Sequence, residues 1–367
     1  MNNSSLFSPI KLGRNQLTHR VVLAPLTRFR ATLSGEPTDS VIEYYSQRSS
    51  PGGFMITEAT FINPFSGGFP HAPGIYTQTQ LQQWKKVASA VHKKGAIIFL
   101  QVWHVGRAGT KYLNPNQEEV ISASSIAIGG NSVLTGRPFE VPRAMDINDI
   151  KELIADHRQA ALNVIEAGFD GIEISSAAGY LLDQFINSSS NKRTDQYGGN
   201  KENRCRLALE VIGAVVDAVG QERTSIRLSP GGDFQDMKDD LPIETYSYLV
   251  SQLQARFPRL AYIHLIEVRS SFFSDEVNTI DTLAPYRKIW KGPIITANGF
   301  STATQHAIDF AERTGSLIAF GRAFLANPDL PHRLCHNLPL NKYDRSTFYT
   351  NDDVGYTDYP FTELTQK

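Results

Sequence analysis

Short apolar runs alternate with longer amphipathic segments along the whole chain. The runs that predict strands are 21–24, 54–57, 97–102, 171–174, 225–228, 262–266, 293–296 and 317–320. Several of these runs are almost continuously apolar, which is typical of strands that are buried on both faces of a sheet. A regular alternation of strands with helices predicts a parallel sheet whose strands are joined by crossover helices.

The amphipathic segments place their apolar residues at helical spacing, on one face. The clearest predicted helices are 79–94, 147–166, 207–219 and 302–313. Asp146 precedes the second of them as an expected N-cap, and Gly95 and Gly168 follow the first two, where a glycine commonly ends a helix. We therefore expect these helices to pack their apolar faces against the sheet.

Eight strand-and-helix units predict an α/β fold, a (β/α)8 TIM barrel, with residues 1–367 forming a single domain. An open doubly wound sheet is the alternative, but the G-x-G-x-x-G turn of dinucleotide-binding sheets is missing after the first strand. Segment 108–143, between the third strand and its helix, is rich in Gly, Pro, Asn and Ser. We expect this segment to form a cap over the barrel mouth, and a small hairpin is one form it could take.

The charge of the chain is balanced. Its 36 Lys and Arg residues and 37 Asp and Glu residues are interspersed, which argues against a nucleic-acid partner or a membrane surface. The longest apolar run, 96–100, is too short to span a membrane, and the amino terminus has no signal-peptide pattern. Cys205 and Cys335 lack metal-ligand spacing, so we expect free thiols and no metal site. These features predict a cytoplasmic enzyme, a monomer or a homodimer, that acts on a small molecule.

Candidate binding residues follow the predicted strands, at the end of the barrel where active sites of this fold lie. Gly321 and Arg322 come after the eighth strand, where backbone N–H groups and an arginine commonly hold a phosphate. A surface arginine after a tight turn is the alternative for Arg322. Asn298 and Gly299, after the seventh strand, would add backbone donors. Arg227 ends the fifth strand, and a structural salt bridge is its alternative role.

A series of motifs covers nearly the whole chain in a fixed order. They are APLTR (24–28), YYSQR (44–48), GGFPHAPG (67–74), QVWHVGR (101–107), the stretch 171–206, RLSP (227–230), GRAF (321–324), NPDL (327–330) and LNKYDR (340–345). In this order the motifs resemble the Old Yellow Enzyme family, ene reductases that carry flavin mononucleotide (FMN) in a TIM barrel. The resemblance implies bound FMN, with NADPH or NADH as a transient reductant at the same open face.

The resemblance also assigns residues to the cofactor. Arg227 and Gln101 would contact the pyrimidine edge of the flavin ring, where negative charge collects on reduction. Thr27 would offer its hydroxyl to a ring carbonyl, and Ala59 would let the backbone approach the ring. The full set of expected cofactor-binding residues is Pro25, Leu26, Thr27, Ala59, Gln101, Arg227, Asn298, Gly299, Gly321 and Arg322.

On the substrate side, Tyr180 matches the family's catalytic tyrosine, which protonates the substrate after hydride transfer. Three aromatic residues align with substrate-facing positions of the family, and a fourth follows the sixth strand and is expected to join them; a place in the core is the alternative for each. These residues are Phe69, Trp103, Phe272 and Tyr356.

Other polar residues receive structural interpretations. His104 and Arg107 belong to the W-H-x-G-R motif and are expected to be mainly structural. His264 and Glu267, near the end of the sixth strand, could form a polar pair, and no third ligand at suitable spacing favours a metal. Because the chain has no G-x-S-x-G turn, the serines after the fourth strand are poor candidates for a hydrolase nucleophile.

One departure from the family's pattern concerns the substrate-binding positions Ser175 and Ala178. The family has a histidine at the first position and an asparagine or second histidine at the second, and this pair holds the substrate carbonyl. Losing one such donor costs roughly 3–4 kcal/mol of transition-state stabilisation. The short Ser175 hydroxyl would reach an oxygen only through a water. We therefore expect weak reduction of simple enones.

This departure leaves three hypotheses open. The first is reduction of an acceptor that is already electrophilic, such as an iminium or a quinone-methide-like intermediate, in specialised (secondary) metabolism. The second is flavin-dependent desaturation, isomerisation or cyclisation of a bulky metabolite in the space that the small side chains leave. The third is a flavin-binding barrel with little catalysis, and the match at Tyr180 weighs against it.

Overall fold

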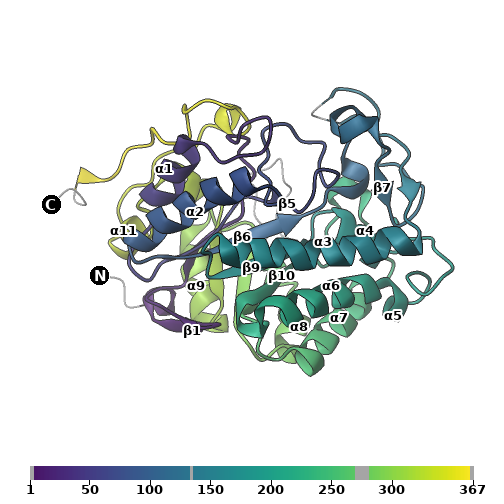
Figure 1. Ribbon diagram of the computed structural model, residues 1–367. Helices are drawn as coiled ribbons and strands as arrows, with labels where there is room; N and C mark the ends of the chain where they lie inside the picture. Colours follow the sequence, from purple (N-terminus) through teal and green to yellow (C-terminus); the bar gives the residue numbers. More distant parts are fainter. Residues whose placement is uncertain (1–3, 133–134, 269–280, 364–367) are drawn as a thin grey trace.

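The computed structural model describes residues 4–132, 135–268 and 281–363, and in it eight parallel strands close into a barrel (Figure 1). The ring runs in the order β4-β3-β13-β12-β11-β10-β9-β6, and pairing of β4 with β6 closes it. The eight strands are β3 (Val21–Leu23), β4 (Phe54–Ile56), β6 (Ile97–Trp103), β9 (Gly171–Ser176), β10 (Thr224–Leu228), β11 (Tyr262–Ile266), β12 (Ile294–Ala297) and β13 (Leu317–Phe320). The prediction of a TIM barrel is confirmed.

Helices surround the barrel (Figure 1). Those of the described residues are α1 (Asp39–Gln47), α2 (Gln78–Lys93), α3 (Ile147–Glu166), α4 (Leu181–Ile186), α5 (Lys201–Arg204), α6 (Arg206–Val219), α7 (Pro242–Arg256), α8 (Ala284–Ile289), α9 (Thr304–Thr314), α10 (Arg322–Ala326) and α11 (Leu330–Cys335). Asp146 caps α3 as predicted, because its carboxylate accepts hydrogen bonds from the backbone N–H groups of Asn148 and Asp149. Gly95 and Gly168 lie just past α2 and α3 with positive φ.

Two apolar layers lie on the two sides of the strands. On the outer side, alternate strand residues such as Ile172, Ile174 and Ile226 pack with the apolar faces of the helices. The inner side is filled by another apolar cluster, which also includes residues of the hairpin β1 (Ile10–Leu12) and β2 (Asn15–Leu17). Since the amino-terminal end of the barrel is packed with apolar side chains, its polar interior residues lie toward the carboxyl end of the strands.

Segment 108–143 stands between β6 and α3, as predicted. It contains the short 3-10 helices Lys111–Leu113 and Pro115–Gln117, and β7 (Ile121–Ser122) pairs in parallel with β8 (Arg143–Ala144). An antiparallel bridge joins Asn131 to Pro138. The segment is tied to the loop after β10, because the backbone N–H of Gly129 donates to Asp236 Oδ2 at 2.6 Å.

Three further features of the described residues concern partners and cofactors. None of their helices combines the length and the apolar character that crossing a membrane requires. Cys205 is buried and Cys335 half-buried, and both are free thiols. Over the same residues, no three His, Cys, Asp or Glu side chains converge on a point where they could hold a metal ion.

Candidate active site

Polar side chains gather on the inner face of the barrel at the carboxyl end of the strands. Phe99 belongs to the interior apolar cluster, so Gln101, two positions later on β6, faces the interior as well. Gln101 is in register with Glu173 of β9. Two positions after Glu173, Ser175 is in register with Arg227 of β10, and Arg227 is in register with His264 of β11. All five side chains therefore point to the same side of the sheet.

Glu173 is the centre of this group. Its Oε1 accepts from Gln101 Nε2 at 2.6 Å, and its Oε2 accepts from His264 Nδ1 at 2.9 Å. Burial favours a raised pKa for this carboxyl, but the attraction of His264 and Arg227 and the two hydrogen bonds outweigh burial and hold the pKa of Glu173 low. Burial lowers the pKa of the His264 imidazole, and the neighbouring Glu173 carboxylate acts in the opposite direction.

The expected pairing of His264 with Glu267 is wrong. The partner of His264 is Glu173, whereas the carboxylate of Glu267 accepts hydrogen bonds from the backbone N–H and the hydroxyl of Thr282 at 3.1 and 2.5 Å. The reason is geometric: residues three positions apart at the end of a strand point to opposite faces.

Arg227 completes the polar group on the inner face. Burial lowers the pKa of its guanidinium, and the nearby Glu173 carboxylate opposes that shift. An arginine nevertheless stays charged in proteins. Its buried Nε has no hydrogen-bond partner among the described residues. A charged group with an unused donor at the top of the barrel fits a bound ligand that presents an acceptor.

Small and backbone-exposing residues surround this group at the neighbouring strand ends. Pro25, Leu26 and Thr27 follow β3, and Ala59, only 5% exposed, follows β4. Across the mouth, Asn298 and Gly299 follow β12 with positive φ, and Asn298 Nδ2 donates to the Glu267 carbonyl at 2.7 Å. Gly321 follows β13, and a Cβ built on it would lie 3.2 Å from Leu26 Cδ2. The structure thus brings the predicted cofactor-binding residues to one end of the barrel.

This arrangement suits FMN in three respects. The flavin ring presents carbonyl and imide groups to donors and acceptors such as Arg227 and Gln101. The small residues Ala59 and Gly321 place little side-chain volume at the strand ends, where a flat ring would have to approach the backbone. A ring that collects negative charge on reduction also agrees with a guanidinium at this position.

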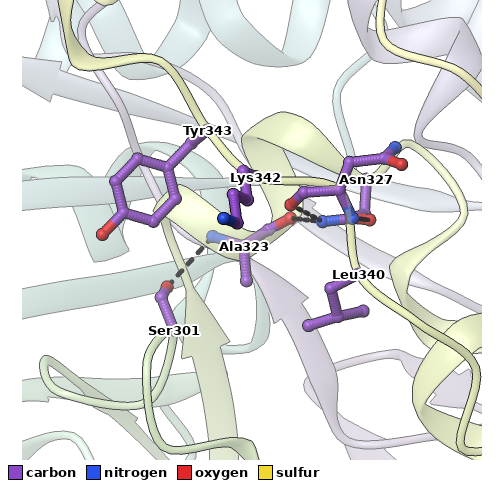
Figure 2. Close-up of a pocket in the computed structure, with 7 residues that line it drawn as sticks. Ser301, Ala323, Asn327, Leu340, Lys342 and Tyr343 are labelled. Atoms are coloured by element: carbon purple, nitrogen blue, oxygen red, sulfur yellow. Dashed lines mark hydrogen bonds between the residues drawn. The ribbon is translucent and has the colours of Figure 1, made fainter.

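A cavity of about 380 Å³ adjoins the expected phosphate position. Figure 2 shows Ser301 and Ala323 at one side of it and Tyr343 above them. The Ala323 N–H, in the first turn of α10, donates to Ser301 Oγ at 3.1 Å, and Arg322 Nη1 donates to the Tyr343 hydroxyl at 3.3 Å. Our sequence reasoning gave no role to Ser301 or Tyr343, although Tyr343 belongs to the LNKYDR motif.

The turn from β9 to α4 presents Tyr180. Ala178 and Gly179 both have positive φ, of 56° and 75°, which reverses the chain sharply. Asp183 fixes this turn by accepting from the Gly179 N–H at 2.8 Å, from Ser229 Oγ at 3.1 Å and from the Tyr246 hydroxyl at 2.6 Å. Tyr180 is therefore held immediately before the first turn of α4.

Aromatic residues and an amide surround the Tyr180 side chain. Trp103 meets the Tyr180 ring edge-on with centroids 4.7 Å apart, and Phe69 contacts Trp103 at 5.5 Å. Burial raises the pKa of the Tyr180 phenol well above its usual value, although a hydrogen bond from Gln235 acts in the opposite direction. Tyr180 consequently keeps its proton at neutral pH, as a proton donor must. The predicted neighbours Phe69, Trp103 and Tyr180 are brought together.

Tyr356 does not join this wall. Its ring has no exposed surface, stacks on Tyr44 with centroids 4.3 Å apart, and lies beneath the guanidinium groups of Arg28 and Arg30. This burial argues against a substrate role for Tyr356. The residue instead occupies a place in the core, which was the alternative. Tyr349, on the same carboxyl-terminal segment, is 51% exposed instead.

Tyr349 lies beside the aromatic cluster of Phe69 and Trp103, a position that sequence reasoning missed. It contacts Phe29 with ring centroids 5.6 Å apart, and Phe29 stacks on Phe69 at 6.1 Å. Its position depends on how the carboxyl-terminal segment crosses the barrel end, and no local sequence pattern predicts that path. The other predicted wall residue, Phe272, lies outside the described residues.

The structure also locates the two substituted positions. Ser175 is 6% exposed and points into the barrel at the end of β9. Ala178 is half-buried, and its backbone N–H donates to Ser229 Oγ at 2.8 Å. Neither position carries the imidazole or amide of the family's pair, so the side chains beside Tyr180 are smaller there.

Comparison with known proteins agrees with this geometry. The chain is 48% identical to 12-oxophytodienoate reductase 1 of Oryza sativa subsp. japonica over 98% of its length and 93% of the relative. It is 45% identical to 12-oxophytodienoate reductase 2 of Arabidopsis thaliana, covering 98% of the chain and 96% of the relative. The structure of the old yellow enzyme homologue from Zymomonas mobilis matches with a TM-score of 0.90 and 37% identity, over 98% of this chain and all of that one.

The sequence model of the NADH:flavin oxidoreductase / NADH oxidase family matches residues 5–341. This match covers every strand of the barrel and the predicted cofactor-binding residues. FMN is the cofactor that the family implies. The chain therefore belongs to this family of FMN oxidoreductases and is an oxidoreductase of the Old Yellow Enzyme type.

Proposed function

We propose that this enzyme takes reducing equivalents from NADPH or NADH and passes them to a conjugated or otherwise electrophilic organic substrate. The observation that carries the proposal is the position of Tyr180, a protonated phenol held by Trp103 beside the polar group at the barrel mouth. Bound FMN would supply the hydride transfer. The protein would then supply orientation, charge and a proton.

We assign particular residues of the chain to each of these contributions. Arg227 would place positive charge, and Gln101 a hydrogen-bonding amide, at the pyrimidine edge of the ring. Thr27 would donate its hydroxyl to a ring carbonyl. Arg322, beside the α10 amino terminus, would hold the phosphate. Tyr180 would donate the proton from its hydroxyl to the substrate carbon, as a general acid.

The substrate class follows from the small side chains of Ser175 and Ala178. The curated relatives are named as reductases of 12-oxophytodienoate. Because this chain lacks the imidazole and amide donors that the family's pair offers a substrate carbonyl, we propose an acceptor that is electrophilic without such help. Small side chains at these two positions also favour a bulky compound of specialised metabolism. We expect the enzyme to act in the cytoplasm, as a monomer or a homodimer.

Desaturation, isomerisation or cyclisation of a bulky metabolite is the second candidate function. The same small side chains at positions 175 and 178 favour it, since these reactions also need space above the ring and a proton donor. A barrel that only binds flavin is the weakest candidate. It would give no reason for a half-buried phenol at Tyr180 whose pKa is raised and which Gln235 contacts by a hydrogen bond.

A reduction experiment separates these functions. Purified protein reconstituted with FMN is bleached anaerobically with NADPH or NADH and then mixed with a small enone. Bleaching without reoxidation by the enone indicates a specialised acceptor, and conjugated polycyclic compounds are screened next. Fast reoxidation by the small enone would show that the missing pair does not matter. Protein that cannot be reconstituted with FMN would refute the proposal.

Phenol titration tests the substituted pair directly. Members of the family hold phenolate at the pair and give a long-wavelength charge-transfer band. We expect a weak band or none from the wild-type chain, and a stronger band with tighter phenol binding from Ser175→His with Ala178→Asn. A strong wild-type band would show that another donor has taken the place of the pair.

A further inference from the structure

Glu173 is a buried carboxylate inside the barrel, directly below the mouth. Its side chain is fully buried, and its two oxygens are used by Gln101 and His264. Gln101 carries no charge, and burial lowers the pKa of His264 against the opposing effect of the Glu173 carboxylate. A buried charge is costly unless a favourable charge lies nearby. The charge that lies nearby is Arg227.

Packing of the barrel interior does not explain why a charged residue stands at position 173. The interior below it is packed with apolar residues such as Phe54 and Phe99, and a further apolar side chain at position 173 would continue that packing. The polar group begins at the level of Gln101 and Glu173, where the predicted ring contacts also begin. Glu173 therefore acts on the site at the barrel mouth, directly above it.

We propose that Glu173 is a positioning residue for the flavin ring, and this inference rests on the proposed FMN site. Its first effect is to orient the Gln101 amide. Because Gln101 Nε2 donates inward to Glu173, the amide oxygen is left as an acceptor for an imide N–H of the ring. Its second effect is electrostatic. The carboxylate offsets part of the positive charge of Arg227, so it limits how strongly the mouth favours negative charge on the ring.

The charge-removing variant Glu173→Gln tests the electrostatic effect. Without the carboxylate, Arg227 is no longer offset, and reduction of bound FMN becomes easier. We expect its midpoint potential, measured by anaerobic titration against a reference dye, to become more positive. A tenfold shift of the equilibrium toward reduced FMN corresponds to about 30 mV for a two-electron couple.

The charge-keeping variant Glu173→Asp tests the orienting effect. The shorter side chain keeps the negative charge but does not reach Gln101 and His264 together. We expect roughly tenfold weaker binding of oxidised FMN, about 1.4 kcal/mol, with a potential close to that of the wild type. Fluorescence titration with FMN gives the dissociation constant.

Asp239→Asn is the matched control. Asp239 is also a buried carboxylate, 8% exposed, but it pairs with Arg204 at 3.1 Å outside the barrel. We expect this variant to lose stability without a change in FMN potential. An unchanged potential in Glu173→Gln would overturn the electrostatic effect, and unchanged FMN binding in Glu173→Asp would overturn the orienting effect. If the wild-type protein binds no FMN, the proposed function fails instead.

Discussion

Ala178 occupies a backbone conformation that alanine disfavours. Its φ is 56°, in the left-handed region, and the following Gly179 is left-handed as well. An L-residue with a Cβ there loses roughly 1–2 kcal/mol, whereas asparagine tolerates this region better. Substitution of Ala178 by Asn, the family's alternative residue, should therefore raise the free energy of unfolding by about 1 kcal/mol. The backbone N–H would keep its bond to Ser229.

Urea-induced unfolding at saturating FMN measures this effect. For a slope of about 3 kcal/mol per molar urea, a gain of about 1 kcal/mol moves the midpoint by about 0.3 M. Ala178→Gly should gain less, because glycine also loses more chain entropy on folding. Ala178→Val should lose stability, since a β-branched residue is strongly disfavoured at positive φ.

The order of the three variants decides whether backbone conformation is the cause. The variants Ala178→Asn and Ala178→Gly should both have a higher free energy of unfolding than Ala178→Val. If Ala178→Val is as stable as the wild type and Ala178→Asn is less stable, the left-handed conformation is not what limits stability at Ala178. In that case the stability change must come from side-chain contacts of the wall beside Tyr180.

Three other predictions concern the proton donor, the phosphate site and pH. Tyr180→Phe should slow protonation of the substrate at least 100-fold in single-turnover experiments while leaving FMN binding unchanged, because general acid catalysis contributes roughly 10²–10⁴-fold. Arg322→Ala should weaken FMN binding about 10- to 100-fold, the worth of a charge-assisted hydrogen bond, and Tyr343→Phe should weaken it less. Burial raises the pKa of Glu58 to about 7, so the stability contributed by its proton is complete below pH 4.5 and is lost as pH rises through 7. Between pH 4.5 and pH 7 the free energy of unfolding of the wild type should fall by roughly 3 kcal/mol more than that of Glu58→Gln. Urea unfolding at several pH values measures this difference.

Each of these expectations has a result that contradicts it. Equal protonation rates in Tyr180→Phe would remove this phenol from the reaction. Unchanged FMN affinity in Arg322→Ala would make that arginine a surface residue, the alternative that its spacing left open. Parallel pH profiles of wild type and Glu58→Gln would show that Glu58 has the same pKa in the folded and the unfolded chain.

The sequence was sufficient for the architecture because strand and helix patterns are local. The apolar runs fall on all eight barrel strands, and Asp146 forms its cap within three residues of itself. The sequence also indicated which residues lie at the open end, since a barrel brings every strand end to one face. Knowing that a residue follows a strand, as Gln101 and Arg227 do, is enough to place it at the mouth.

Partners across the barrel depended on the tertiary structure. Glu173 and His264 are 91 positions apart, and only the register of β9, β10 and β11 brings them together. The loop geometry that buries Tyr356 against Tyr44 and leaves Tyr349 exposed is likewise not encoded in a short pattern. The sequence by itself determined the fold and the set of residues at its open end, because periodicity and strand order are properties of the chain. Tertiary structure decided which of those side chains touch, because contact depends on register, on loop paths and on the burial of charge.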